Sequence, residues 1–295
     1  MTSTTVDIEG HTLTLSNLDK VLYPNGFTKG QVIDYYVRIA PFLLPHLSGR
    51  ACTMVRWPDG VQSGKHFFNK NLPSHTPEWV QRTTQGDVTY GVVENLATLV
   101  WMANLASLEL HVPMHRAADD SFEPDRIVFD LDPGPGTGVT ECCEIALEIR
   151  DLLGPLSFTM VAKTSGSKGV QLYARPPARM PYGGEGGTTA FAKRVAEGLE
   201  AKMPHRVVSK QNKELRPGKI LIDWSQNVSA KTTVAVYSLR ARDTPTVSTP
   251  ISWDEVEQGA DGTVMVFTAD DVLQRVERIG DLFGADAGSV ADDRP

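Results

Sequence analysis

The feature that most constrains this 295-residue sequence is a short β-rich run, Arg126 to Leu131, that meets two prolines and two glycines at 133–136. Proline and glycine at this density end a strand and begin a loop. Asp130 and Asp132 are two residues apart, so a strand places both carboxylates on one face and their apolar neighbours on the other. Paired carboxylates repel each other unless a cation lies between them, and their hard oxygen ligands suit Mg²⁺ or Mn²⁺. The alternative is a plain turn, which aspartates before Pro-Gly commonly form.

A third aspartate, Asp223, lies in another apolar run, Lys219 to Trp224. A buried lone carboxylate costs free energy unless it is paired or bound to a metal. If the two strands are neighbours, Asp130, Asp132 and Asp223 are candidates to hold two metal ions ~3.5–4 Å apart, an arrangement suited to phosphoryl transfer. Taken alone, Asp223 is equally compatible with a place at the surface edge of a sheet.

Strand and helix signals alternate along the chain without strict βαβ periodicity, which predicts an α+β fold with mixed or antiparallel sheets flanked by helices. Apolar spacing predicts helices over 28–44, 95–108, 139–153, 188–203 and 270–283. Extended or β-rich runs predict strands over 12–15, 51–57, 66–68, 126–131, 158–163, 169–174 and 219–224. We expect one domain over residues 1–283 and a mobile tail over 284–295, whose small and polar residues offer little to bury.

The composition is that of a folded protein with no membrane-spanning segment. Apolar residues make up 41% and charged residues 22% of the chain, close to globular averages. The longest uncharged run, Asn95 to Leu108, is shorter than the ~20 apolar residues that a bilayer requires. Three cysteines make neither a disulfide framework nor a zinc site, and no export signal precedes the first strand, so we expect a cytoplasmic protein.

Charge is distributed unevenly along the chain. The net charge of −7 argues against a nucleic-acid partner, yet residues 160–245 carry 15 Lys and Arg against 6 Asp and Glu. Such a segment is either a footprint for phosphate or an ordinary fluctuation of charge. It contains Lys163 to Gly169, a loop whose hydroxyls, ammonium groups and glycine-exposed amides are suited to cradling phosphate. The loop lacks the Walker spacing, and by itself it is equally compatible with a plain hairpin.

Several strings match one family, in the same order along the chain. These strings are Asn17 to Pro24, Arg56 to Gly60, Leu110 to Pro113, Val128 to Gly134, Thr164 to Gly169, Ile222 to Asn227, Lys231 to Thr233 and Tyr237 to Arg240. Through them the chain resembles the polymerase domain of bacterial ligase D, a member of the archaeo-eukaryotic primase superfamily, from about Leu13 to Phe283.

The resemblance implies the primase-polymerase fold and an enzyme that adds nucleotides to a primer. The family's catalytic aspartates carry over to Asp130, Asp132 and Asp223, which then hold two Mn²⁺ or Mg²⁺ ions. The implied substrates are NTP or dNTP, and Arg216 resembles an arginine that contacts the template. The residues that fall where the family contacts the incoming nucleotide are His111, Ser165, Lys168, Gln171, Gln226, Lys231 and Arg240.

The resemblance also implies a DNA partner, a gap or an end that carries a 5′-phosphate. Asn17, Lys20 and Lys29 occupy the places of an asparagine and two lysines that bind this phosphate in the family. Phe67 and Phe68 match an aromatic pair that stacks on template bases. Without the resemblance, the polar residues are expected to be solvated, and alternation along a strand predicts one buried and one exposed ring.

Two departures from the family pattern affect these expectations. Most relatives have His where this chain has Gln171, and glutamine still donates a hydrogen bond but carries no charge. The sequence contains no Lys-x-Asp-Gly string of a DNA ligase, so we expect a stand-alone enzyme that fills short gaps in DNA repair or primes, with sealing left to a separate DNA ligase. Ser165 and Gln226 lie near the expected sugar site, which implies a preference for ribonucleotides.

Two other functions stay open. The segment Phe129 to Asp132 also looks like the opening of a haloacid-dehalogenase phosphatase site, although Gly134 stands where that family has Thr or Val. The second is a non-catalytic protein that binds DNA ends or gaps and aligns them for a ligase. It predicts binding that depends on Lys20 and Lys29, with no incorporation of nucleotides.

Overall fold

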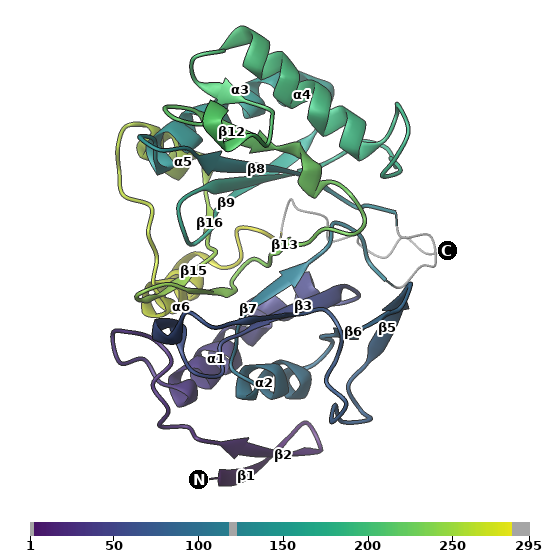
Figure 1. The fold of residues 1–295 in the computed structure, drawn as a ribbon, viewed down its shortest axis with the longest axis vertical. Helices are drawn as coiled ribbons and strands as arrows, with labels where there is room; N and C mark the ends of the chain where they lie inside the picture. The colour runs from purple at the N-terminus through teal and green to yellow at the C-terminus, as the bar shows by residue number, and fades with distance from the viewer. Residues whose placement is uncertain (1–2, 118–122, 285–295) are drawn as a thin grey trace. The chain divides into compact units, whose positions relative to one another are not determined.

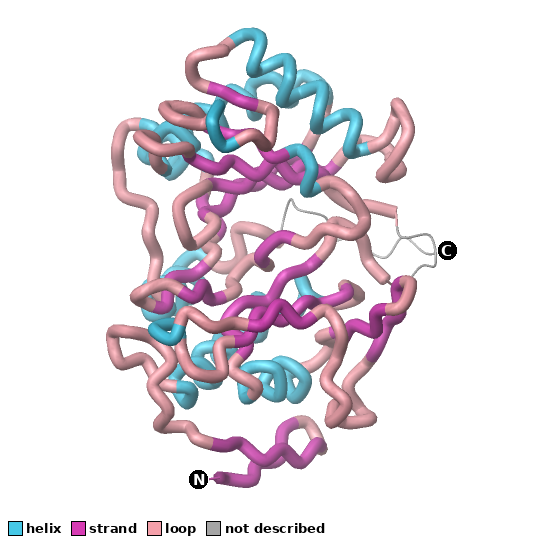
Figure 2. Tube along the Cα trace, viewed as in Figure 1, coloured by secondary structure: helices cyan, strands magenta, loops and turns pink. Residues whose placement is uncertain are grey.

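The structure is a computed structural model that describes residues 3–117 and 123–284. The chain divides into two units, unit 1 with residues 1–113, 232–248 and 267–280, and unit 2 with residues 114–231, 249–266 and 281–295. Helices and mainly antiparallel β-sheet occur in both, which confirms the predicted α+β class (Figure 2). One domain over residues 1–283 stays a prediction, and the expected mobile tail falls almost entirely on residues outside the described ranges.

Unit 1 is built on an antiparallel sheet of order β13-β7-β3-β6-β5, with β4 paired beside β3. Its strands are β3 (Ala51–Arg56), β4 (Phe67–Asn69), β5 (Arg82–Gln85), β6 (Val88–Val92), β7 (Ser107–Val112) and β13 (Thr233–Val234). Two further antiparallel pairs stand outside this sheet: β1 (Ser3–Ile8) with β2 (His11–Ser16), and β14 (Leu239–Ala241) with β15 (Pro245–Val247). The β14 strand packs on β7.

The helices of unit 1 begin and end at identifiable residues. They are α1 (Lys29–Leu47), α2 (Leu96–Asn104) and α6 (Ala269–Ile279), with a short η1 turn at Val61–Ser63. A capping box of Thr28 and Gln31 starts α1. The prediction of a helix over 95–108 was wrong at its end, because Ala106 has a φ of 58° that no helix continues. The last helix also ends before residue 283, at Gly280 with a φ of 71°.

Unit 2 is built on a sheet of order β11-β12-β8-β10-β9-β16, in which only the β11–β12 pair is parallel. Helices α3 and α4 pack on this sheet, and α5 packs against α3 (Figure 1). The strands are β8 (Ile127–Pro133), β9 (Thr159–Thr164), β10 (Val170–Arg175), β11 (Val207–Val208), β12 (Ile220–Asp223) and β16 (Pro250–Ile251). The helices are α3 (Val139–Leu153), α4 (Thr188–Lys202) and α5 (Trp253–Ala260), with the short turns η2 (Gly154–Leu156), η3 (Lys213–Leu215) and η4 (Trp224–Gln226).

The predicted elements of unit 2 are confirmed to within a residue or two at each end. The period of two holds along β8, where Phe129 and Leu131 are fully buried on the face opposite to that of Asp130. Across the described ranges, no helix combines the length and the apolar character needed to span a membrane.

Candidate active site

The three aspartates lie together on the sheet of unit 2. Strand β12 pairs with β8 so that Asp223 is directly opposite Asp130, and Leu221 is opposite Asp132. Directly opposed residues of antiparallel strands point to the same face, and so do residues two apart on one strand. The structure therefore brings together the carboxylates that the sequence placed on separate strands.

Asp130 is buried, with only 9% of its surface exposed. Burial first, and then the charge of Asp132, raise the pKa of its carboxyl to about 7, and the charge of Asp223 acts in the same direction. A hydrogen bond from Gln171 and the charge of Lys163 lower this pKa without cancelling the rise. At neutral pH the group of carboxylates is therefore stabilised by binding a proton or a cation.

A row of polar side chains continues from Asp130 across β10 and β9. Gln171 stands directly opposite both Asp130 and Lys163. Its Nε2 donates to Oδ1 of Asp130 at 3.0 Å, and its Oε1 accepts from Nζ of Lys163 at 2.5 Å. Lys163 is fully buried, and its ammonium lies 5.4 Å from the ring centroid of Tyr173. The glutamine that departs from the family pattern thus links a buried cation to a carboxylate.

The η4 turn fixes the orientation of Asp223. Its Oδ1 accepts from the backbone N–H of Ser225 at 3.0 Å and from the Ser225 hydroxyl at 2.6 Å, and its Oδ2 accepts from Nε2 of Gln226 at 2.9 Å. Lys231 donates from Nζ to Oγ of Ser225 at 2.5 Å. Asn227 holds the turn to the backbone of β8 through hydrogen bonds of 2.8 and 2.7 Å. Two predicted nucleotide-binding residues, Gln226 and Lys231, therefore gather around Asp223.

The carboxylates have the chemistry of a divalent-cation site that substrate completes. Among the described residues, no three His, Cys, Asp or Glu side chains converge tightly enough to hold one ion. Mg²⁺ commonly takes only one or two carboxylates and fills its shell with water and substrate phosphates. The donor set of Asp130, Asp132 and Asp223 and the raised pKa of Asp130 fit that mode of binding.

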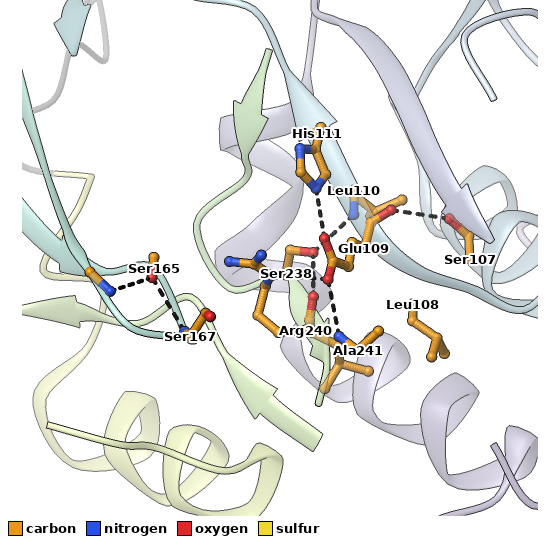
Figure 3. A network of polar contacts seen from close by, with 12 residues as sticks. Ser107, Leu108, Glu109, Leu110, His111, Ser165, Ser167, Ser238, Arg240 and Ala241 are labelled. Carbon is orange, nitrogen blue, oxygen red and sulfur yellow. Dashed lines mark hydrogen bonds and ion pairs between the residues drawn. The ribbon is translucent and has the colours of Figure 1, made fainter. Parts of the chain in front are cut away.

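The loop between β9 and β10 is a tight hairpin organised by Ser165 (Figure 3). The Ser165 N–H donates to the Gly169 carbonyl at 2.9 Å, and its Oγ accepts from the N–H groups of Ser167 at 3.3 Å and Gly169 at 3.1 Å. A Cβ at position 169 would lie 2.2 Å from the carbonyl oxygen of Leu131, so the close approach requires glycine. Lys168 is exposed on this loop. The hairpin therefore lies beside the carboxylate-bearing end of β8.

The basic loop that contains Arg216 packs against the same end of β8. The Gly134 N–H donates to the Lys219 carbonyl at 2.9 Å, and the Gly218 N–H donates to the Pro135 carbonyl at 2.8 Å. A Cβ at Gly134 would lie 1.9 Å from the Arg216 carbonyl oxygen. The Arg216 guanidinium itself donates hydrogen bonds to the backbone carbonyl and the side-chain oxygen of Gln211, at 2.9 and 3.0 Å.

Backbone hydrogen bonds connect the predicted 5′-phosphate residues of unit 1, which are Asn17, Lys20 and Lys29. The Lys20 N–H donates to the Asn17 carbonyl at 3.0 Å, and the Lys29 N–H donates to the Lys20 carbonyl at 2.8 Å. The Lys29 ammonium donates to the Ser16 carbonyl at 2.6 Å, whereas Lys20 pairs with Asp59 at 3.2 Å. Burial, followed by the charges of Lys20 and a nearby arginine, lowers the pKa of Lys29 to about 8. These residues concentrate positive charge.

Phe67 and Phe68 are both exposed, at 57% and 52%, although they are neighbours on β4. Among the described strands, β4 pairs with β3 and lies off the main path of the sheet. The expectation of one buried ring, drawn from alternation, does not hold here. The Phe68 ring lies edge-on to His111, with their centroids 5.8 Å apart.

His111 and Arg240 of unit 1 are joined through Glu109 (Figure 3). Nε2 of His111 lies 2.8 Å from one carboxylate oxygen, Nε of Arg240 lies 3.1 Å from the other, and the Ala241 N–H donates to that second oxygen at 3.1 Å. Burial tends to raise the pKa of Glu109, but the His111 hydrogen bond and the Arg240 charge outweigh it and lower the pKa to about 2. Glu109 is therefore ionised at neutral pH.

Sequence reasoning missed Glu109, Lys163 and Ser225 as parts of these clusters. Glu109 had a usable signal, because it lies two residues before His111 and a strand period of two puts both on one face. Ser225 lies within a matched string, two residues after Asp223. Lys163 had no such signal, since its partner is decided by the register of β9 against β10.

Three strand carboxylates beside a basic hairpin, in an α+β fold, are the arrangement of a nucleotidyltransferase of the DNA polymerase type. The family described as "LigD, primase-polymerase domain" matches residues 28–283. The chain belongs to this family.

Individual proteins agree with the family assignment. The chain is 46% identical over 274 residues to the multifunctional non-homologous end joining protein LigD of Mycolicibacterium smegmatis, covering 91% of this chain and 35% of that protein. It is 33% identical over 270 residues to the bifunctional non-homologous end joining protein LigD of Bacillus subtilis, covering 91% of this chain and 43% of that protein. The chain thus spans well under half the length of these relatives.

A solved structure extends the likeness to three dimensions. The polymerase domain from Mycobacterium tuberculosis ligase D in complex with DNA matches with a TM-score of 0.84 and 41% sequence identity. The match covers 92% of this chain and 96% of that chain. A primase-polymerase fold, expected from the sequence, is thereby confirmed.

Proposed function

We propose that this chain extends the 3′-hydroxyl of a DNA primer opposite a template, and so fills short gaps during the joining of DNA ends. The observation that carries the proposal is the register of β8 and β12, which sets Asp223 directly across from Asp130 with Asp132 on the same face. The names of the relatives, end-joining proteins, support the pathway. The DNA-bound state of the M. tuberculosis domain supports the substrate.

In this proposal Asp130, Asp132 and Asp223 hold two Mg²⁺ or Mn²⁺ ions. Bound ions would lower the pKa of the primer hydroxyl and offset triphosphate charge. The primer oxygen attacks the α-phosphorus, and the bond to pyrophosphate breaks as the new P–O bond forms. Gln171 holds the Asp130 carboxylate, while the residues of η4 hold Asp223, so both enter the reaction already oriented.

The nucleotide is bound, in this proposal, by polar and cationic side chains. Hydroxyl, amide and cationic groups suit the phosphates and sugar of a nucleoside triphosphate. Gln226, which donates to Asp223, and Ser165, which shapes the hairpin, favour ribonucleotides through contacts with the sugar. The full set of proposed contacts is His111, Ser165, Lys168, Gln171, Gln226, Lys231 and Arg240.

The DNA is bound through three further groups of residues. Asn17, Lys20 and Lys29 bind the 5′-phosphate across the gap, which their backbone hydrogen bonds and the lowered pKa of Lys29 support. The exposed Phe67 and Phe68 rings stack on template bases, and Arg216 contacts the template strand. The filled gap is then sealed by a DNA ligase.

The test is extension of a labelled primer on a gapped duplex, with Mg²⁺ or Mn²⁺ and either NTPs or dNTPs. We expect template-directed addition that falls at least a hundredfold in Asp130→Ala or Asp223→Ala, roughly the loss of one essential group. Asp151→Asn, an exposed carboxylate on α3 of the same unit, is the matched control and should leave the rate unchanged.

The assay can contradict each part of the proposed function. Gap binding without extension under any metal or nucleotide would favour the alternative, a protein that only aligns DNA ends. Equal use of NTPs and dNTPs, unaltered in Gln226→Ala, would refute the sugar contact. Equal extension with and without the 5′-phosphate would refute the role of Asn17, Lys20 and Lys29.

A further inference from the structure

The Glu109 cluster, formed by Glu109, His111, Arg240 and the backbone of Ala241, joins two strands of unit 1 that are far apart in the sequence. Glu109 and His111 lie on β7, and Arg240 and Ala241 lie on β14. Only 10% of the Glu109 side chain is exposed, against 15% for His111 and 14% for Arg240. One buried carboxylate therefore contacts both side chains for which we propose a nucleotide contact.

We propose that Glu109 is a positioning residue that holds His111 and Arg240 in the orientation in which they bind the phosphates of the incoming nucleotide. This inference rests on the proposed function, because it assigns to Glu109 a role only through those two side chains. Glu109 itself carries negative charge and would repel a triphosphate, so a direct contact is not part of the proposal.

The geometry explains why a carboxylate is required at this position. One oxygen of Glu109 lies 2.8 Å from Nε2 of His111. The other accepts from the Ala241 N–H at 3.1 Å and forms an ion pair with Arg240, whose Nε lies 3.1 Å away. An ionised acceptor fixes which ring nitrogen of His111 faces inward. It also orients the plane of the Arg240 guanidinium, whose donors form a rigid fork. Two flexible side chains thus lose their freedom before substrate arrives.

A carboxylate in the same unit provides a matched control. Glu94 accepts a hydrogen bond from the Ser48 hydroxyl at 2.6 Å and from the Gly49 N–H at 2.7 Å, so it too joins two chain segments. Neither His111 nor Arg240 is among these partners. Glu94→Gln therefore measures how the loss of a carboxylate with a purely structural role changes Tm and KM.

The experiment measures kcat and KM for the nucleotide on a gapped duplex, gap binding, and thermal unfolding. Glu109→Gln should raise KM roughly tenfold, as expected for partners within one hydrogen-bond network. We expect kcat within about twofold of the unaltered protein, since oriented ground-state contacts chiefly affect binding. Gap binding should not change, and KM should stay unchanged in Glu94→Gln. Tm should fall further in Glu109→Gln than in Glu94→Gln, because Glu109 is buried and Glu94 is exposed, so the kinetics are measured well below the lower Tm.

A combined variant separates positioning from a general structural role. In the His111→Ala, Arg240→Met background, adding Glu109→Gln should change KM no further. A tenfold rise that persists in this background, or an unchanged KM in Glu109→Gln alone, would overturn the inference. If Glu109→Gln does not fold, Glu109→Asp is used, which keeps the charge on a side chain one methylene shorter. This variant should have a KM between those of the unaltered protein and of His111→Ala, Arg240→Met. A KM equal to that of the unaltered protein would overturn the inference.

The same measurements distinguish this inference from the proposed function. Raised KM in His111→Ala and in Arg240→Met, with normal KM in Glu109→Gln, would leave the nucleotide contacts standing and remove the positioning role. Normal KM in both single variants would remove the proposed contacts themselves, and the role of Glu109 with them.

Discussion

Replacing both partners of the buried Lys163 and Gln171 pair should cost less stability than the sum of the two single replacements. In Gln171→Leu the fully buried Lys163 ammonium loses its amide partner, which costs about 2–3 kcal/mol of the free energy of unfolding for a hydrogen bond to a charged group. In Lys163→Met the Gln171 oxygen loses its donor, which costs about 1–3 kcal/mol. The double variant leaves neither Lys163 nor Gln171 without its partner, so it should cost less than the sum of the two single losses, although Asp130 loses its hydrogen bond from Gln171 here too.

Urea unfolding of the four proteins measures these differences, and a loss of about 2 kcal/mol corresponds to a fall in Tm of roughly 4–8 °C. Lys202→Met is the control: this side chain is 64% exposed and pairs with Glu148, so its loss should change stability by under about 0.5 kcal/mol. Primer extension should fall in both Gln171→Leu and the double variant, because both lose the hydrogen bond to Asp130. A double variant whose loss equals the sum of the single losses within about 0.5 kcal/mol would refute this reasoning.

Three further predictions follow from the electrostatics and exposure of the site residues. Binding of a 5′-phosphorylated gap, followed by fluorescence anisotropy, should weaken as the pH rises through about 8, where Lys29 loses its proton, and Lys29→Arg should remove that dependence. Because the pKa of Asp130 is about 7 in the folded chain and near 3.8 when unfolded, stability is lost as the pH rises between these values. Asp130→Asn should therefore raise the free energy of unfolding in EDTA at pH 8, with no gain near pH 4. Phe67→Ala and Phe68→Ala should each weaken template binding by about 1–3 kcal/mol, whereas Val264→Ala, at an apolar side chain that is even more exposed at 79%, should not.

Local sequence signals were sufficient for five of the six α-helices and for strands such as β3 and β8, but they did not reveal β5, β6 or β7 among the described residues. The capping residue Thr28 and the apolar spacing after it predicted α1, and the Pro-Gly run predicted where β8 ends. The same signals did not predict where α2 ends, because Ala106 adopts a positive φ, which is not expected for alanine. Backbone conformation there is set by the entry into β7, which is a tertiary constraint.

The candidate site divides in the same way. Asp130 and Asp132 were placed on one face by the period of a strand, which is a local property. Their proximity to Asp223 depends on the pairing of β8 with β12. The sequence does not predict this pairing, because the two strands are about 90 residues apart and nothing local specifies their register. The links from Asp130 through Gln171 to Lys163 depend on two further registers.

By itself the sequence determined the class of fold, the strand that bears the carboxylate pair and, through ordered strings, the family. These are encoded by residue periodicity and by residue types at fixed spacing, which act over a few positions. Only the tertiary structure decided that a fully buried lysine faces Gln171, that both phenylalanines of β4 are exposed, and that Glu109 joins β7 to β14. The physical reason is that pairing register and burial arise from contacts between distant segments, whose free energies are set by the whole folded chain.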